Sequence, residues 1–238
     1  MKFDYVHPFD LLVQKPEGDI RLAEAALLFA ADHAPGLDPR PWLERLDGLA
    51  RRVERIEVVS PADQVAALRA VLVEEEGFAA NSTDYYDPRN SLLNEVIERR
   101  VGIPITLSTI WLDIARQLRW PFAGVGLPGH FVIKRPSPIG DMLIDPFGGG
   151  QILSRAKCER LVSQLLGRKV ELDNSAFEVV GVKATLMRML NNLRVIFSQQ
   201  EAWSQTACVL ARMLALEPES ETIRSEIARV GVKIAELN

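Results

Sequence analysis

Apolar residues recur every three or four positions through most of the first 120 residues, which is the spacing of helices with one buried face. The run 20–34 follows this pattern closely. Asp38-Pro39 and Ser60-Pro61 each place a capping side chain directly before a proline, a combination that favours the first turn of a helix. The pattern predicts a region of packed helices over residues 1–80.

The most apolar helix is predicted over residues 104–118, where the spacing leaves only one thin polar edge. This helix begins with Pro104, which suits a first helical turn. Residues 81–90 read NSTDYYDPRN, are rich in turn formers, and predict an ordered loop. A short helix follows the loop, and we expect Asn90 or Ser91 to cap it.

Short segments rich in β-branched and aromatic residues are confined to residues 121–153, where Gly and Pro separate them. The stretch PSPIG, residues 136–140, predicts a hairpin loop. Ser154 is expected to cap a further helix, and residues 171–238 return to helical spacing. The order predicts an α+β fold with a core at residues 81–170. In this fold a small antiparallel sheet packs on the buried helix, and C-terminal helices close the other side.

The composition is that of a globular chain, with 238 residues of which 47% are hydrophobic and 25% are charged. A formal net charge of −4 argues against nucleic-acid binding through a basic surface. No apolar run approaches the length of a membrane span, and the N-terminus lacks the apolar stretch of a signal peptide. Two cysteines and three histidines at unrelated spacings form neither a disulfide framework nor a metal motif. We therefore expect a cytoplasmic protein with no cofactor and no metal.

His130 and Asp145 are the most informative polar pair in the predicted sheet. A hairpin centred on residues 137–138 places them opposite each other, with Cβ atoms about 4.5–5.5 Å apart. A carboxylate beside an imidazole orients the ring and fixes its tautomer, as in catalytic histidines. A histidine at a strand start and an aspartate capping a turn before Pro146 would leave the same pattern. A register slipped by one residue would separate the pair.

A His–Asp pair needs a nucleophile to perform acyl chemistry. Thr106 and Ser108 are hydroxyls near the start of the predicted buried helix, where the helix dipole favours negative charge. Cys158 is the thiol nearest to the β region in sequence, although a small packing residue is the commoner role of such a cysteine.

Polar residues around the short helix form a candidate ligand-binding surface. A solvated helix face has the same composition. The candidate residues are Tyr86, Asn90, Asn94 and Arg99.

Four motifs, NSLLN, GIPI, PGHF and IDPF, occur in an order that resembles a known family. They resemble the SirB-type transglutaminase-like proteins, in which a papain-like core precedes tetratricopeptide-like helices. The resemblance covers roughly residues 80–200 and is weaker over the N-terminal helices. It implies a papain/transglutaminase-like core, a buried helix on a small antiparallel sheet, flanked by N-terminal and C-terminal helices.

Transglutaminase-like enzymes use Cys, His and Asp, with the cysteine at the start of the buried helix. His130 and Asp145 match the last two residues of that set. Pro104 stands where the cysteine is expected, and proline has no nucleophilic group. The resemblance therefore implies the fold and a cleft, and it leaves the parent chemistry without its nucleophile.

Three functions fit this pattern. The favoured one is a non-catalytic, regulatory or binding module for a peptide or protein partner, of undetermined oligomeric state. The alternative is a hydrolase or acyltransferase in which His130 activates a relocated nucleophile at Cys158, Ser108 or Thr106. The third is a structural scaffold that retains the His–Asp pair as a relic. Residues 171–238 resemble about one and a half tetratricopeptide units, too few for a free-standing solenoid.

Overall fold

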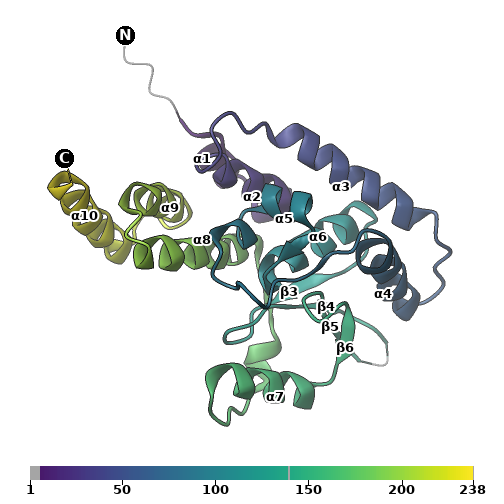
Figure 1. Cartoon of the computed structure of the whole chain (residues 1–238). Coiled ribbons are helices and arrows are strands. Elements are labelled where there is room, and N and C mark those ends of the chain that lie inside the picture. The colour runs from purple at the N-terminus through teal and green to yellow at the C-terminus, as the bar shows by residue number, and fades with distance from the viewer. Residues whose placement is uncertain (1–5, 139, 238) are drawn as a thin grey trace.

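The computed structural model describes residues 6–138 and 140–237 (Figure 1). Most residues of α6 (Pro104–Gln117) are buried, and the N-terminal helices α2, α3 and α5 all contact it. The helices before α6 are α1 (Pro8–Leu12), α2 (Leu22–Ala30), α3 (Pro39–Glu54), α4 (Pro61–Arg69) and α5 (Leu93–Arg99).

Two of the predicted helix starts form as the sequence indicates. The side chains of Asp38 and Ser60 accept hydrogen bonds from backbone N–H groups in the first turns of α3 and α4, at 3.0 and 3.2 Å. The short helix α5 differs, because it begins after Leu92 and no side chain caps it. The expectation that Asn90 or Ser91 caps this helix is wrong.

The sheet has the strand order β6-β5-β4-β3-β7, and every neighbouring pair is antiparallel. Helix α6 contacts β3 and β4, so the predicted α+β core is confirmed. The strands are β3 (Ala123–Val125), β4 (Val132–Arg135), β5 (Met142–Asp145), β6 (Gln151–Leu153) and β7 (Val179–Val180). A short parallel pair, β1 (Ala79–Ala80) and β2 (Val101–Gly102), lies against α6.

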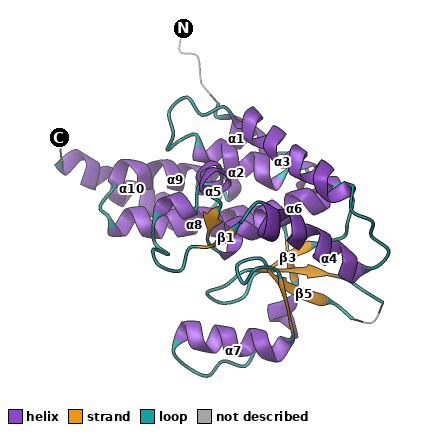
Figure 2. Ribbon diagram, turned by 45° about the vertical axis from the view of Figure 1, so that its right-hand side comes forward, coloured by secondary structure: helices purple, strands orange, loops and turns teal. Residues whose placement is uncertain are grey.

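The two faces of the sheet belong to two apolar clusters. Ile133 and Ile144 pack in the larger cluster with α6, whereas Val132 and Leu143 pack in a smaller cluster with residues of α7 (Arg155–Leu166). Helix α7 therefore covers the face opposite α6, below the sheet in Figures 1 and 2. The expectation that the C-terminal helices close that face is wrong, because α7 already supplies the apolar side chains it needs.

The C-terminal helices form a row of neighbours that extends the larger cluster away from the sheet (Figure 2). Helix α8 (Val182–Gln199) packs on α9 (Trp203–Leu216), and α9 packs on α10 (Glu221–Glu236). Helix α8 also contacts α2 and α6, through which this row joins the core. Among the helices of the described residues, none has the length and apolar character needed to cross a bilayer.

A buried ion pair joins the N-terminal helices to α6. The side chain of Asp113 is fully buried and accepts hydrogen bonds from Arg21 Nε at 2.8 Å and Arg21 Nη2 at 2.7 Å. Arg21 also pairs with Asp47, whose side chain is 36% exposed. A bidentate ion pair of this kind stabilises the fold only while both charges are present, because leaving one buried charge unpaired lowers the free energy of unfolding.

Replacing Asp113 by Ala is expected to lower the free energy of unfolding by about 3 kcal/mol, because it leaves the Arg21 guanidinium without its buried partner. Asp47→Ala is the matched control and is expected to cost less than about 1 kcal/mol, since the Asp113 contact remains. Urea unfolding followed by circular dichroism measures both values. Equal losses in the two variants would contradict the importance given to Asp113.

Candidate functional site

The structure brings His130 and Asp145 together in the sheet. His130 lies two residues before β4 and Asp145 ends β5, and His130 Nε2 lies 3.1 Å from Asp145 Oδ1. Both side chains are buried. The ring of Phe147 meets the His130 ring edge-on at 5.9 Å, and the Phe147 N–H donates to Asp145 Oδ1 at 3.1 Å. The imidazole is thus oriented from two sides.

The observed register differs from the predicted one by two residues, with Ile133 opposite Ile144. His130 and Asp145 are therefore diagonal rather than direct neighbours. Because side chains alternate between faces with a period of two, a shift of two residues keeps them on the same face. Diagonal neighbours remain within reach of a long side chain such as histidine. The predicted loop 136–140 includes residue 139, which lies outside the described residues.

A cleft of about 370 Å³ lies beside this pair. Pro104, the first residue of α6, and His130 both line it, so the helix start that the resemblance singles out borders the same cleft as the imidazole. The lining residues are Tyr85, Pro104, Ile105, Gly129, His130, Phe131, Arg188, Asn191 and Asn192. No cysteine, serine or threonine is among these described lining residues.

The GIPIT sequence builds the start of α6. A Cβ atom at Gly102 would lie 2.8 Å from Thr106 Oγ1, so only glycine allows the chain to pass this close. Thr106 Oγ1 accepts a hydrogen bond from the Ile103 N–H at 3.1 Å and donates to the Asn90 carbonyl at 2.8 Å. The hydroxyl of Thr106 is therefore engaged in holding the helix start, and it is not a free nucleophile.

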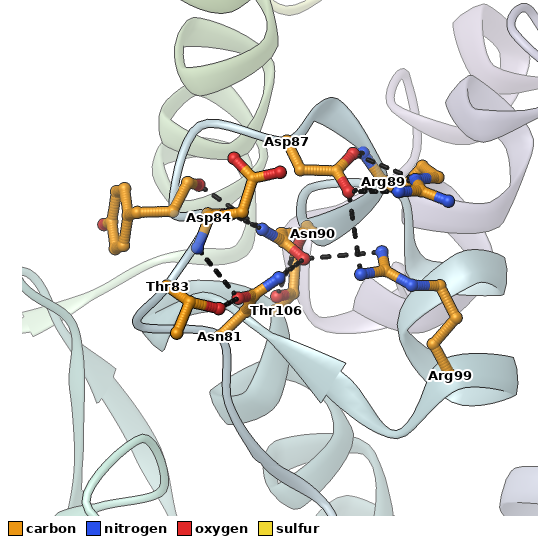
Figure 3. A network of polar contacts seen from close by, with 9 residues as sticks. Asn81, Thr83, Asp84, Asp87, Arg89, Asn90, Arg99 and Thr106 are labelled. Atoms are coloured by element: carbon orange, nitrogen blue, oxygen red, sulfur yellow. Dashed lines mark hydrogen bonds and ion pairs between the residues drawn. The ribbon is translucent and has the colours of Figure 1, made fainter.

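The loop before α5 is held by a polar network centred on Asn90 (Figure 3). Asn90 Nδ2 donates to the Asp84 carbonyl at 2.7 Å, and Asn90 Oδ1 accepts from Asn81 Nδ2 at 3.0 Å. Arg99 donates to the same Oδ1 at 3.4 Å and lies 3.6 Å from the carboxylate of Asp87. Asn90 and Arg99, two of the predicted ligand-binding residues, are therefore bonded within the protein and do not line the cleft.

The other two predicted ligand-binding residues lie in different surroundings. Asn94 is buried, and its Oδ1 has no partner among the described residues. Tyr86 is 63% exposed and meets the Tyr85 ring edge-on at 5.4 Å. Since Tyr85 lines the cleft, Tyr86 is a candidate for contact with a ligand at its rim.

Ser108 and Cys158 are both away from the cleft. Ser108 is fully buried, and its hydroxyl has no hydrogen-bond partner among the described residues. Cys158 is buried in the α7 cluster, on the sheet face opposite α6. Burial, with a smaller effect of the Asp145 charge, raises the pKa of the Cys158 thiol to about 11. Neither residue is among those that line the cleft.

Helix α8 contributes three polar residues to the cleft that were not among the predicted site residues. Arg188, Asn191 and Asn192 form one polar stripe at helical spacing, and all three line the cleft. The polar residues within LMRMLNNLRVIF can be recognised in the sequence, but the sequence does not show which part of the fold these residues contact. The groups available in the cleft are thus an imidazole, a guanidinium, a phenol and two amides. Within the described residues, no group of His, Cys, Asp or Glu is arranged to hold a metal ion.

Replacing Thr106 by Val tests how the start of α6 is held. The variant keeps the shape of the side chain and leaves the Ile103 N–H and the Asn90 carbonyl unpaired, with an expected loss of about 2 kcal/mol in the free energy of unfolding. Ser108→Ala is the matched control, because it removes a buried hydroxyl that has no partner. Its stability is expected to be unchanged or raised by up to about 1 kcal/mol. Denaturant unfolding that ranks the two variants in the opposite order would refute this assignment.

The raised pKa of Cys158 predicts an unreactive thiol. With a pKa of about 11, only about one thiol in 10⁴ is ionised at pH 7, so iodoacetamide is expected to react about three hundredfold more slowly than with free cysteine. In a Cys208→Ser background the rate should increase about tenfold per pH unit below pH 11 and should not respond to His130→Ala. Mass spectrometry follows the labelling. Fast labelling that depends on His130 would instead reveal an activated thiol.

Comparisons with known proteins find relatives in bacteria and in animals. The UPF0162 protein of Xylella fastidiosa (strain 9a5c) is 34% identical over 211 residues, which cover 85% of this chain and 74% of that protein. The UPF0162 protein of Pseudomonas aeruginosa is 33% identical over 190 residues, or 79% of this chain and 68% of the relative. The F-box only protein 21 of Mus musculus is 34% identical over 167 residues, or 66% of this chain and 25% of that protein. No solved structure matches.

A family model described as the transglutaminase-like superfamily matches residues 40–191. The match begins in α3 and ends within α8, so it includes His130, Asp145 and Arg188. Because the matched segment contains the whole of α6 and the antiparallel sheet from β3 to β7, we conclude that this chain belongs to the transglutaminase-like superfamily.

Proposed function

We propose that this chain is a non-catalytic member of its superfamily that binds an extended peptide segment of a partner protein in the cleft beside His130. Pro104 carries the proposal, because it lines the cleft at the helix start where a nucleophile is needed. A general base activates a nucleophile only at about 2.6–3.2 Å. Losing the nucleophile of a covalent mechanism removes several orders of magnitude of rate.

The surroundings of the cleft favour an extended chain as the ligand. Tyr86, which contacts the lining residue Tyr85, and Leu165, which lies near the lining residue Gly129, are exposed by 63% and 55%, respectively. Leu165 and Leu166 approach the cleft at Gly129, where an added Cβ would be 3.8 Å from Leu166 Cδ2. Exposed apolar side chains that flank a polar cleft fit a peptide with apolar residues on both sides of a polar one.

The C-terminal helices support the finer assignment to SirB-type proteins. Helices α8, α9 and α10 pack in sequence order, as helices of tetratricopeptide-like repeats do, and α8 forms one wall of the cleft. A partner that binds this row of helices would also be close to the cleft. The two cysteines are free, and a cytoplasmic location remains part of the proposal.

A direct test selects peptides from a random displayed library on the purified chain and measures their affinity by calorimetry. Asn192→Trp should fill the cleft and weaken binding at least tenfold, whereas Gln200→Trp, at the end of the same helix, should leave binding unchanged. A library that yields no binder, or binders indifferent to Asn192→Trp, would overturn the proposal. Mass spectrometry of the mixtures checks for cleavage or deamidation, and turnover abolished by His130→Ala would favour the hydrolase or acyltransferase alternative.

Replacing Pro104 by Cys in a Cys158→Ser, Cys208→Ser background tests the position of Pro104. If Pro104 occupies the place of a nucleophile, His130 will stabilise the thiolate, and the pKa of the introduced thiol is expected to fall at least one unit below the ordinary value of about 8.5. Thiolate ultraviolet absorbance measures the titration. Addition of His130→Gln should restore the ordinary pKa. An ordinary pKa in both variants would show that Pro104 does not face the imidazole in the required way.

A further inference from the structure

Arg188 lines the cleft. Its positively charged guanidinium has contacts with neutral groups alone among the described residues. Its Nη2 atom donates to the Leu127 carbonyl at 2.8 Å and to the His130 carbonyl at 2.9 Å. Its guanidinium carbon is 5.6 Å from the centre of the Phe131 ring. Among the ion pairs of residues 6–138 and 140–237, none includes Arg188.

Three other partly buried arginines have carboxylate partners. Arg21 pairs with two aspartates, Arg212 likewise pairs with two, and Arg194 pairs with Glu226 at 2.6 Å. A charge removed from water without a counter-charge costs several kcal/mol. Burial accordingly lowers the pKa of Arg188. Arg188 therefore carries a partly buried positive charge for which the described residues supply no carboxylate.

The guanidinium of Arg188 is held in a fixed position, and some of its N–H groups have no hydrogen-bond acceptor among the described residues. A Cβ atom at Gly126 would lie 2.3 Å from Arg188 Nη1, so glycine at this position makes room for the group. Both hydrogen bonds from Arg188 to described residues use Nη2, so the Nε and Nη1 hydrogens donate to no described residue. Either of these free N–H groups can donate a charge-assisted hydrogen bond to a carboxylate oxygen.

The neighbouring side chains add donors and no negative charge. Asn191 Oδ1 accepts from Arg194 Nε at 3.1 Å, which leaves the Asn191 amide nitrogen as a donor for another acceptor. Asn192 lines the same cleft, and no described residue of its lining is acidic. The cleft thus presents one uncompensated positive charge with amide donors beside it.

We propose that Arg188 binds a carboxylate of the peptide ligand, so that the cleft selects a segment with an acidic side chain or a free C-terminus. This inference rests on the proposed peptide-binding function and specifies its chemistry. Arg188 determines specificity, and its hydrogen bond to the His130 carbonyl also couples ligand binding to the position of the histidine. Because the charge is partly desolvated, a carboxylate should gain more here than at an exposed arginine.

Three short synthetic peptides test the proposal by nuclear magnetic resonance titration of the isotope-labelled full chain. They are acetyl-Ala-Glu-Ala-amide, its neutral match acetyl-Ala-Gln-Ala-amide, and acetyl-Ala-Ala-Ala with a free C-terminus. At least one carboxylate peptide is expected to shift the His130 and Arg188 side-chain signals and to bind at least tenfold more tightly than the Gln peptide. Which of the two does so distinguishes an acidic side chain from a chain terminus.

Arg188→Gln should remove this discrimination, and Arg188→Lys should retain only part of it, because lysine keeps the charge but not the planar guanidinium that the Leu127 and His130 carbonyls hold in place. Lys183→Gln removes one positive charge from the same helix outside the cleft and should change nothing. If the Gln peptide binds the unmodified chain as well as the carboxylate peptides do, the carboxylate proposal is overturned while peptide binding stands. Absence of any shift at cleft signals with all three peptides overturns the carboxylate proposal. Peptide binding itself is judged separately, by the library selection.

Discussion

The hydrogen bond from the Thr106 hydroxyl to the Asn90 carbonyl is the contact on which the geometry of the cleft depends. It ties the first turn of α6 to a loop that is itself braced by the side chain of Asn90. Gly102 permits this contact, because any larger residue would collide with Thr106. The position of Pro104 relative to His130 follows from this arrangement. The polar network centred on Asn90, where a binding surface was predicted, therefore supports the neighbouring cleft.

The superfamily fold and the chemistry at its centre are separable in this chain. His130 and Asp145 are within hydrogen-bond distance of each other, and the start of α6 lines the same cleft as His130. Proline suits a first helical turn, where a missing N–H leaves no hydrogen bond unmade. In the proposed function, Pro104 keeps the helix and the cleft but supplies no atom that could form a covalent bond. Binding is then the proposed role of the cleft, because a fold does not by itself fix the chemistry at its site.

The cleft is not a property of the α6–sheet unit alone. Helix α8 closes it with Arg188, Asn191 and Asn192, and Arg188 holds the carbonyls of the turn that carries His130. The same helix begins the row formed with α9 and α10. A ligand in the cleft and a partner on the C-terminal helices would thus meet a common element. This shared helix offers a physical route by which partner binding and occupancy of the cleft affect each other.

The sequence by itself determined the features that depend on neighbours along the chain. Asp38 and Ser60 start helices because an N-cap contact spans only two or three residues, and the same locality makes Pro104 recognisable as a helix start. Alternation along strands was sufficient to put His130 and Asp145 on one face, even with the register two residues away from the prediction.

Tertiary structure alone decided which segment each buried or polar face packs against. Cys158 is buried in the smaller apolar cluster between the sheet and α7, Asn90 is bonded in an internal network, and Arg188 lines the cleft from a helix far along the chain. Periodicity identifies a face of a helix or strand, whereas its partner depends on packing between segments far apart in the chain.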